Sequence, residues 1–165
     1  MINDIKRHDD DNLGGNNSYI FIPEDDVLTI PTVFEGAIHT EIILKPLKKW
    51  FFGYGTEGTL RFTDVESEND HGTFYLKKFM CNVPKNRAEL VAIFNKMKNR
   101  KFILLLTDNN GEKILVGTKE EPLSFKNRFD SKDDVPGRNE HEVEFYGEGV
   151  DKSPIFKGLC PLKGY

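Results

Sequence analysis

No uninterrupted apolar stretch in the chain is longer than the five residues from Phe102 to Leu106. Such a run has the length of a β-strand and is far shorter than the roughly 18 residues that a membrane-spanning helix requires. The turn sequence Asp108-Asn109-Asn110-Gly111 and a second run, 113–117, follow it directly. The pattern predicts a β-hairpin and no segment that crosses a bilayer.

Further short runs of β-branched and aromatic residues, separated by Pro, Gly and Asp, are typical of strands. The run 37–45 alternates with a period of two, so we expect Ile38, Ile42 and Leu44 to face a core. The polar segment Glu66 to Gly72 is interpreted as a hairpin loop. The strands predicted are 19–23, 27–33, 37–45, 49–54, 59–66, 72–81, 102–106, 113–117, 123–129, 140–148 and 154–157.

Two of these strands also predict how their side chains divide between faces. In 72–81, the apolar residues Phe74, Leu76 and Met80 share one face. In 140–148, His141, Val143 and Phe145 alternate with Glu142, Glu144 and Tyr146.

One segment, about 87–99, has helical periodicity. Asn86 is predicted to cap it, and Glu89 stands three residues later, as a capping box requires. The stripe expected on the packed face is Leu90, Val91, Ile93, Phe94 and Met97. Many strands with one helix predict a mainly β fold, an antiparallel β-sandwich or partly closed barrel with one flanking α-helix.

A length of 165 residues suits one domain, because separate hydrophobic cores usually need more chain. Residues 1–18 are polar and acidic, which predicts a flexible N-terminal arm. The single β-rich domain then covers 19–157, and 158–165 form a C-terminal tail.

The net charge and the cysteine content disfavour two classes of function, nucleic-acid binding and metal binding through cysteine. The net charge of −4 lacks the general attraction to phosphates of a nucleic-acid binder. Cys81 and Cys160 belong to no metal-binding motif, so we interpret them as buried or idle thiols.

No motif predicts catalysis. The segment Gly53 to Gly58 satisfies GxGxxG, but a strand rather than a helix follows it, so we interpret it as a glycine-rich turn. The four histidines have no metal-site spacing. We predict no catalytic residue, no cofactor and no bound metal, and hence a protein that is not an enzyme.

The segment Lys48 to Tyr54 interleaves basic and aromatic residues. Trp50, Phe52 and Tyr54 alternate on one strand face, and three interpretations stay open for them: core packing, a subunit interface, or stacking on single-stranded nucleic acid.

Basic and acidic residues are concentrated in different parts of the chain. Lys96, Lys98 and Arg100 belong to a basic cluster around the helix, whereas Glu142 and Glu144 belong to an acidic C-terminal region. Complementary patches of this kind could join copies head to tail into a ring, and the alternative is two solvated patches on a monomer.

Three stretches of short turn and strand motifs follow one another along the chain: Gly14-Gly15 with Tyr19-Ile20-Phe21-Ile22-Pro23 and Val27; Phe102 to Gly117; and Glu121-Pro122-Leu123 with Gly137-Arg138-Asn139 and Val143-Glu144-Phe145-Tyr146-Gly147. Together they resemble small structural proteins of the tail modules of tailed phages and prophages.

The resemblance covers most of residues 14–157 and implies a virion structural protein made in the bacterial cytoplasm. A tail-tube-like subunit that assembles into rings is expected first, and a tail-completion or head–tail connector subunit is the alternative. Its expected partners are further copies and other tail proteins, with DNA only as cargo passing through a channel and no membrane. The rival from another class is a monomeric ligand-binding module or small enzyme on a β framework.

Overall fold

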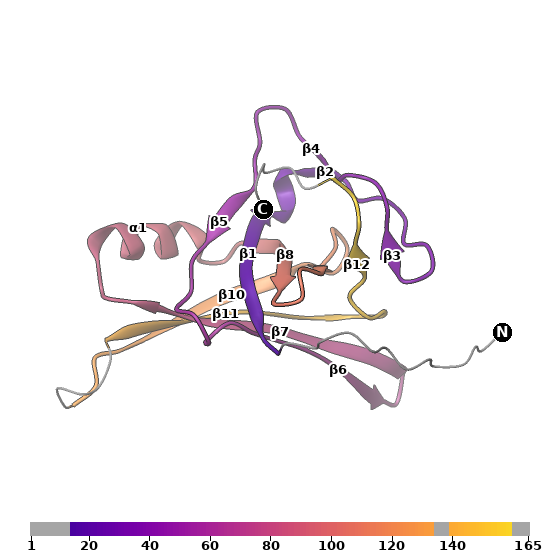
Figure 1. The fold of residues 1–165 in the computed structure, drawn as a ribbon. Helices are drawn as coiled ribbons and strands as arrows, with labels where there is room; N and C mark the ends of the chain where they lie inside the picture. Colours follow the sequence, from indigo (N-terminus) through magenta and orange to yellow (C-terminus); the bar gives the residue numbers. More distant parts are fainter. Residues whose placement is uncertain (1–13, 134–138, 160–165) are drawn as a thin grey trace.

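The computed structural model describes residues 14–133 and 139–159. Within these ranges ten strands form one sheet, β2 and β4 form a small second sheet, and α1 is the one α-helix (Figure 1). The predicted mainly β class is therefore confirmed. The elements are β1 Asn16–Pro23, η1 Glu24–Asp26, β2 Val27–Thr29, β3 Ala37–Ile38, β4 Ile43–Leu44, β5 Phe51–Gly53, β6 Arg61–Asn69, β7 Gly72–Pro84, α1 Ala88–Met97, β8 Lys101–Asp108, β9 Lys113–Val116, β10 Leu123–Asp130, β11 Glu140–Gly149 and β12 Ile155–Phe156.

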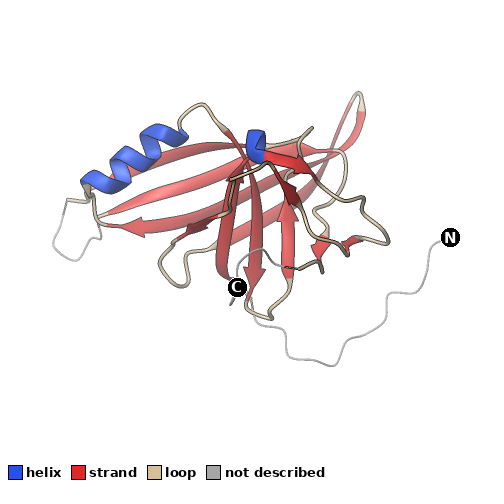
Figure 2. Cartoon of the chain, turned by 90° about the horizontal axis from the view of Figure 1, so that it is seen from above, coloured by secondary structure: helices blue, strands red, loops and turns tan. Residues whose placement is uncertain are grey.

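The large sheet bends where β8 changes partners. Strand β8 pairs antiparallel with β1, and it also pairs with β9 and, through its first residues, with β10. From β10 the sheet continues through β11 and β7 to β6. Figures 1 and 2 show β1 and β8 lying across β11 and β7, so that the sheet curls into a half-barrel. This arrangement agrees with the predicted partly closed barrel.

Strands β1 and β8 are buried on both faces, because each lies between two hydrophobic cores. In β1, Tyr19 faces the first core while Ile20 and Ile22 face the second. In β8, Leu104 and Leu105 divide in the same way, and both are fully buried. A strand covered on both sides needs an uninterrupted apolar run, which explains the composition of 102–106.

Aromatic rings fill the first core. Phe145 of β11 stands at its centre and has no exposed surface. Five rings lie with centroids 5.3 to 6.4 Å from that of Phe145: those of Tyr19, Phe21, Phe79, Phe102 and Phe125. Most of these pairs are tilted or edge-to-face, the arrangements that ring quadrupoles favour.

The β6–β7 ribbon is longer than predicted. Glu66 to Asn69 belong to β6 and pair with β7 up to Gly72, so the predicted polar loop shrinks to a two-residue turn. The face expected to pack is also wrong in β7: Leu76 is 41% exposed, whereas Phe79 and Cys81 on the opposite face are buried. The face of β7 that contains Phe79 and Cys81 is the one that packs against β1. It therefore forms the core, although it also contains Lys77.

The predicted strand 37–45 is interrupted. Ile38 pairs with Phe156 of β12, whereas Ile43 pairs with Thr29 of β2 in the small sheet. The first part of the segment pairs in the large sheet and the second part in the small sheet, so the segment forms two short strands. Thr40, which lies between them, is exposed. The strand predicted at 27–33 likewise contracts to Val27–Thr29.

Helix α1 occupies the predicted position, but its predicted cap is wrong. The N-cap residue is Arg87, which forms no side-chain cap hydrogen bond, and Asn86 contacts His141 instead. No helix in the described ranges has the length and apolar character needed to cross a membrane.

At the ends of the chain, β1 begins at Asn16, inside the predicted arm. Residues 1–13 and 160–165 lie outside the described residues.

Truncating the central ring tests the role assigned to the first core. We expect Phe145→Ala to lower the free energy of unfolding by about 3–5 kcal/mol, because it leaves a cavity among five rings. Phe34→Ala is the matched control, since Phe34 is 66% exposed. Urea denaturation measures both, and equal losses in the two variants would contradict this account of the core.

Candidate functional site: a groove between helix α1 and strand β5

An apolar groove runs between α1 and the edge of the sheet at β5. It consists of two adjoining hollows with volumes of about 240 and 450 Å³. The two hollows share four lining residues: Phe21, Phe52, Ile93 and Met97. We call this surface the α1–β5 groove.

The groove exists because both of its walls are only partly covered. On one side, Phe94 and Met97 anchor α1 to the first core, while Ile93 remains 47% exposed. On the other side, β5 is a short strand that pairs with β1 alone among the described residues. The Phe51 ring stacks on Phe21 at 5.8 Å and is 41% exposed. Apolar side chains of the two walls therefore border open space.

Basic side chains surround the groove. Arg87 lines the first hollow, and Lys96 and Arg100 line the second. All three residues are exposed, and none forms an ion pair with another residue of the described part of the chain. An apolar surface with exposed basic residues at its rim is suited to an apolar partner that also has acidic groups.

The structure separates the three aromatic residues for which core packing, a subunit interface and stacking on nucleic acid were open. Phe52 and Tyr54 line the groove and are 64% and 63% exposed. Trp50 is 3% exposed and belongs to the second core, so core packing is the correct interpretation for it.

The structure also places the three basic residues of the predicted helix cluster, Lys96, Lys98 and Arg100, in different surroundings. Lys96 and Arg100 line the groove together with Phe52, whereas Lys98, the exposed C-cap of α1, is not among the lining residues. Arg87 belongs to the same predicted basic cluster around the helix and lines the first hollow. For Ile93, the helical spacing indicates only packing.

Glu142 and Glu144 lie on the opposite face of β11 from the buried His141, Val143 and Phe145, as the predicted alternation requires. Glu144 is nevertheless only 6% exposed, because Lys78 and Lys126 place their ammonium groups 3.2 and 3.1 Å from its carboxylate oxygens. This carboxylate is neutralised within the chain, so it does not form an open acidic patch.

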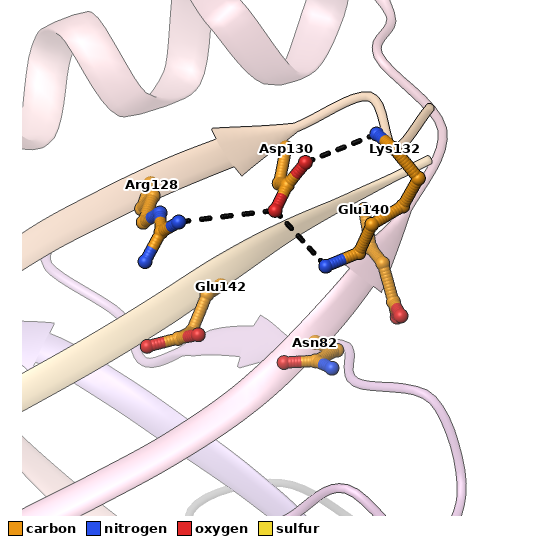
Figure 3. A pocket seen from close by; sticks show the side chains of 6 residues that line it. All are labelled: Asn82, Arg128, Asp130, Lys132, Glu140 and Glu142. Atoms are coloured by element: carbon orange, nitrogen blue, oxygen red, sulfur yellow. Dashed lines mark hydrogen bonds and ion pairs between the residues drawn. The ribbon is translucent and has the colours of Figure 1, made fainter. Parts of the chain in front are cut away.

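Glu142 is exposed and borders a small charged hollow of about 120 Å³ (Figure 3). Its central group is Asp130, which lies 2.9 Å from Lys132 Nζ and 3.8 Å from Arg128 Nη2. Hydrogen bonds from the Lys132 amide and ammonium groups lower the pKa of Asp130. An acid held ionised in this way does not donate a proton at neutral pH, and its exposed ion pairs contribute little to stability.

A buried histidine lies beneath α1. His141 is 4% exposed, its Nε2 lies 3.2 Å from Asn86 Oδ1, and its ring contacts those of Phe94 and Phe129. Desolvation by burial lowers the pKa of His141 below its ordinary value of 6.5. The neutral imidazole thus connects β11 to the segment that begins the helix.

The thiol of Cys81 is buried between β7 and β1, and Sγ donates a weak hydrogen bond to the Tyr19 hydroxyl at 3.6 Å. Burial raises the pKa of Cys81 to about 11. The thiolate is the reactive form, so this group is inert at neutral pH.

The glycine-rich segment that precedes β6 has a packing role. A Cβ at Gly53 would overlap the ring of Tyr19, and Gly58 has a φ of +79°. As predicted, the chain continues into a strand, β6, and not into a helix. Within the described ranges, no group of three or more His, Cys, Asp or Glu residues is arranged to hold a metal ion.

Comparisons with family models, curated proteins and solved structures return no match for this chain.

The burial of His141 makes stability depend on pH. The pKa is lower in the folded chain than in the unfolded chain, so the unfolded state binds the proton more readily. The stabilisation is complete above pH 6.5 and is lost as pH falls through the folded pKa. We expect the free energy of unfolding to decrease between pH 7.5 and 5 more steeply in the wild type than in His141→Phe. Parallel pH profiles for the two proteins would contradict this account.

The buried thiol predicts slow modification. In a Cys160→Ser variant, Cys81 is the remaining cysteine, and we expect an aromatic disulfide reagent at pH 8 to react about a hundredfold more slowly with the folded chain than with the urea-unfolded chain. Absorbance of the released thiolate measures both rates. Equal rates would show that Cys81 is accessible.

Proposed function

We propose that this protein is a non-enzymatic structural subunit that works by assembling with copies of itself. The observation that carries the proposal is the α1–β5 groove, where Phe51 and Ile93 expose apolar surface inside a basic rim. Exposed apolar surface of this kind, bordered by charge, is characteristic of protein interaction sites.

The distribution of perturbed groups supports assembly over catalysis. His141 lies under α1, Cys81 is buried near Tyr19, and Asp130 is half-buried in the hollow of Figure 3. Catalytic sites bring such groups together in one cleft with a nucleophile or base directed at the substrate. In the described part of the chain, neither hollow of the groove contains any of these three residues.

Within this class, we propose a virion structural role in a phage tail, with a tail-tube-like subunit first and a tail-completion or connector subunit second. The support is the resemblance of most of residues 14–157 to tail-module proteins and the compatible architecture, a curled and mostly antiparallel sheet with one flanking helix. The net charge of −4 also suits a protein past which DNA moves without binding. Further copies and other tail proteins are the partners this role requires.

One observation favours a second candidate, a small-molecule binding module. The larger hollow of the groove has a volume of about 450 Å³, within the range of about 300–1,000 Å³ for ligand pockets, and its lining is largely apolar. A monomeric protein that binds an apolar ligand there would support this alternative.

Sedimentation velocity over a concentration series tests the assembly proposal. We expect the wild type to form oligomers that weaken with added salt, because the rim of the groove is charged. Ile93→Asp should shift the protein to monomers by placing a carboxylate on the apolar wall. Val91→Asp is the matched control: Val91 is 41% exposed on the same helix but does not line the groove. A wild type that stays monomeric at every concentration and salt would refute the proposal.

A further inference from the structure

The β6–β7 ribbon extends beyond the rest of the sheet. Strand β11 pairs with β7 only as far as Tyr75, whereas β6 and β7 continue to pair up to Asn69 and Gly72. Residues 67–74 therefore form a two-stranded hairpin with no third strand of the described chain beside it. Such a hairpin is only marginally stable in water by itself. We call residues 64–76, which are this hairpin together with its base, where Tyr75 and Leu76 still pair with β11, the projecting hairpin.

The projecting hairpin has one apolar and one acidic face. Val65 and Leu76 form a cross-strand pair on the outer face and are 53% and 41% exposed. Glu66 and Glu68 lie on the opposite face and are both exposed. Residues 64–76 contain four carboxylates and neither lysine nor arginine.

The groove has the complementary charge. Residues 85–101, which include α1, contain six Lys and Arg residues and one Glu. Figures 1 and 2 show α1 and the turn between β6 and β7 at opposite ends of the molecule. A hairpin and a groove at opposite ends of one rigid sheet cannot meet within the same chain, but they can meet between two copies.

We propose that the projecting hairpin of one copy binds in the α1–β5 groove of the next. In this arrangement Val65 and Leu76 cover the apolar wall formed by Phe51 and Phe52 of β5, and the carboxylates of Glu66 and Glu68 on the opposite face of the hairpin approach Lys96 and Arg100 on the α1 wall. The inference rests on the proposed function, self-assembly, and identifies the two surfaces that meet. Because the surfaces differ, the contact is head to tail and generates rings or filaments.

Two hydrogen bonds within the hairpin support its conformation. The Tyr75 hydroxyl donates to Glu66 Oε2 at 3.2 Å across the two strands, and the His71 amide donates to Asn69 Oδ1 at 2.8 Å in the turn. A segment held in its binding conformation loses little conformational entropy on association. The same groups also keep the acidic face oriented to one side.

Charge reversal tests the pairing. One variant, Lys96→Glu with Arg100→Glu, makes the groove acidic, and a second, Glu66→Lys with Glu68→Lys, makes the hairpin basic. We expect each to raise the dissociation constant of self-assembly about tenfold or more, because like charges then meet. The four substitutions combined in one chain restore opposite charges, and we expect assembly to return. The control reverses two exposed charges elsewhere, Glu112→Lys and Lys157→Glu.

Thermal denaturation of each variant establishes that it is folded, and sedimentation velocity reports assembly. Loss in both single-surface variants with recovery in the combined chain supports the pairing. A wild type that assembles and is insensitive to both reversals overturns the hairpin as the occupant while leaving self-assembly in place. Failure of the combined chain to recover also overturns the pairing. A wild type that never assembles refutes the proposed function itself.

Discussion

The packing of β1 and β8 between two hydrophobic cores is the constraint on which the rest of the structure depends. Each strand contributes alternate side chains to both cores, so neither face is left for solvent. On one side the rings of Tyr19 and Phe102 pack onto Phe145 of β11. This contact holds the two halves of the bent sheet together and determines where β5, which pairs with β1, must lie.

The groove follows from that placement. Strand β5 extends the β1–β8 half of the sheet by only three residues, and α1 is anchored over the other half by Phe94, which contacts Phe125 and His141. The space between them is bordered by side chains from both halves and is filled by neither. The proposed assembly surface lies at the junction of two well-packed units, where apolar area remains uncovered beside basic residues of α1.

The two ends of the large sheet carry opposite charge. The β6–β7 ribbon continues past β11 and concentrates carboxylates, while the α1 end concentrates lysine and arginine. The sheet that connects them is continuous, so the distance between the two surfaces is set by the strands. Complementary surfaces at opposite ends of one chain are what the proposed head-to-tail contacts require.

The sequence predicted strands correctly where an apolar run is followed directly by a turn sequence. The best example is the β8–β9 hairpin, with its turn at Gly111. The packed face of β7 was predicted wrongly, because its outer face contains the apolar Leu76 and its core face contains the charged Lys77. The distribution of apolar residues therefore indicates the wrong face. The Asn86 cap failed because a tertiary contact with His141 competes for the same side chain. The groove joins residues near 52, 93 and 100 through long-range packing, and no local pattern indicates that Phe52 and Lys96 meet there while Trp50 turns into a core.

Amide hydrogen exchange at low and high protein concentration tests the central claim most directly, because it locates the contact surfaces in the unmodified chain. If copies associate through the groove and the projecting hairpin, exchange slows with concentration in 51–54, 90–100 and 66–74, while the β8–β9 turn at 108–112 is unchanged. Exchange that is independent of concentration throughout the chain would contradict the account.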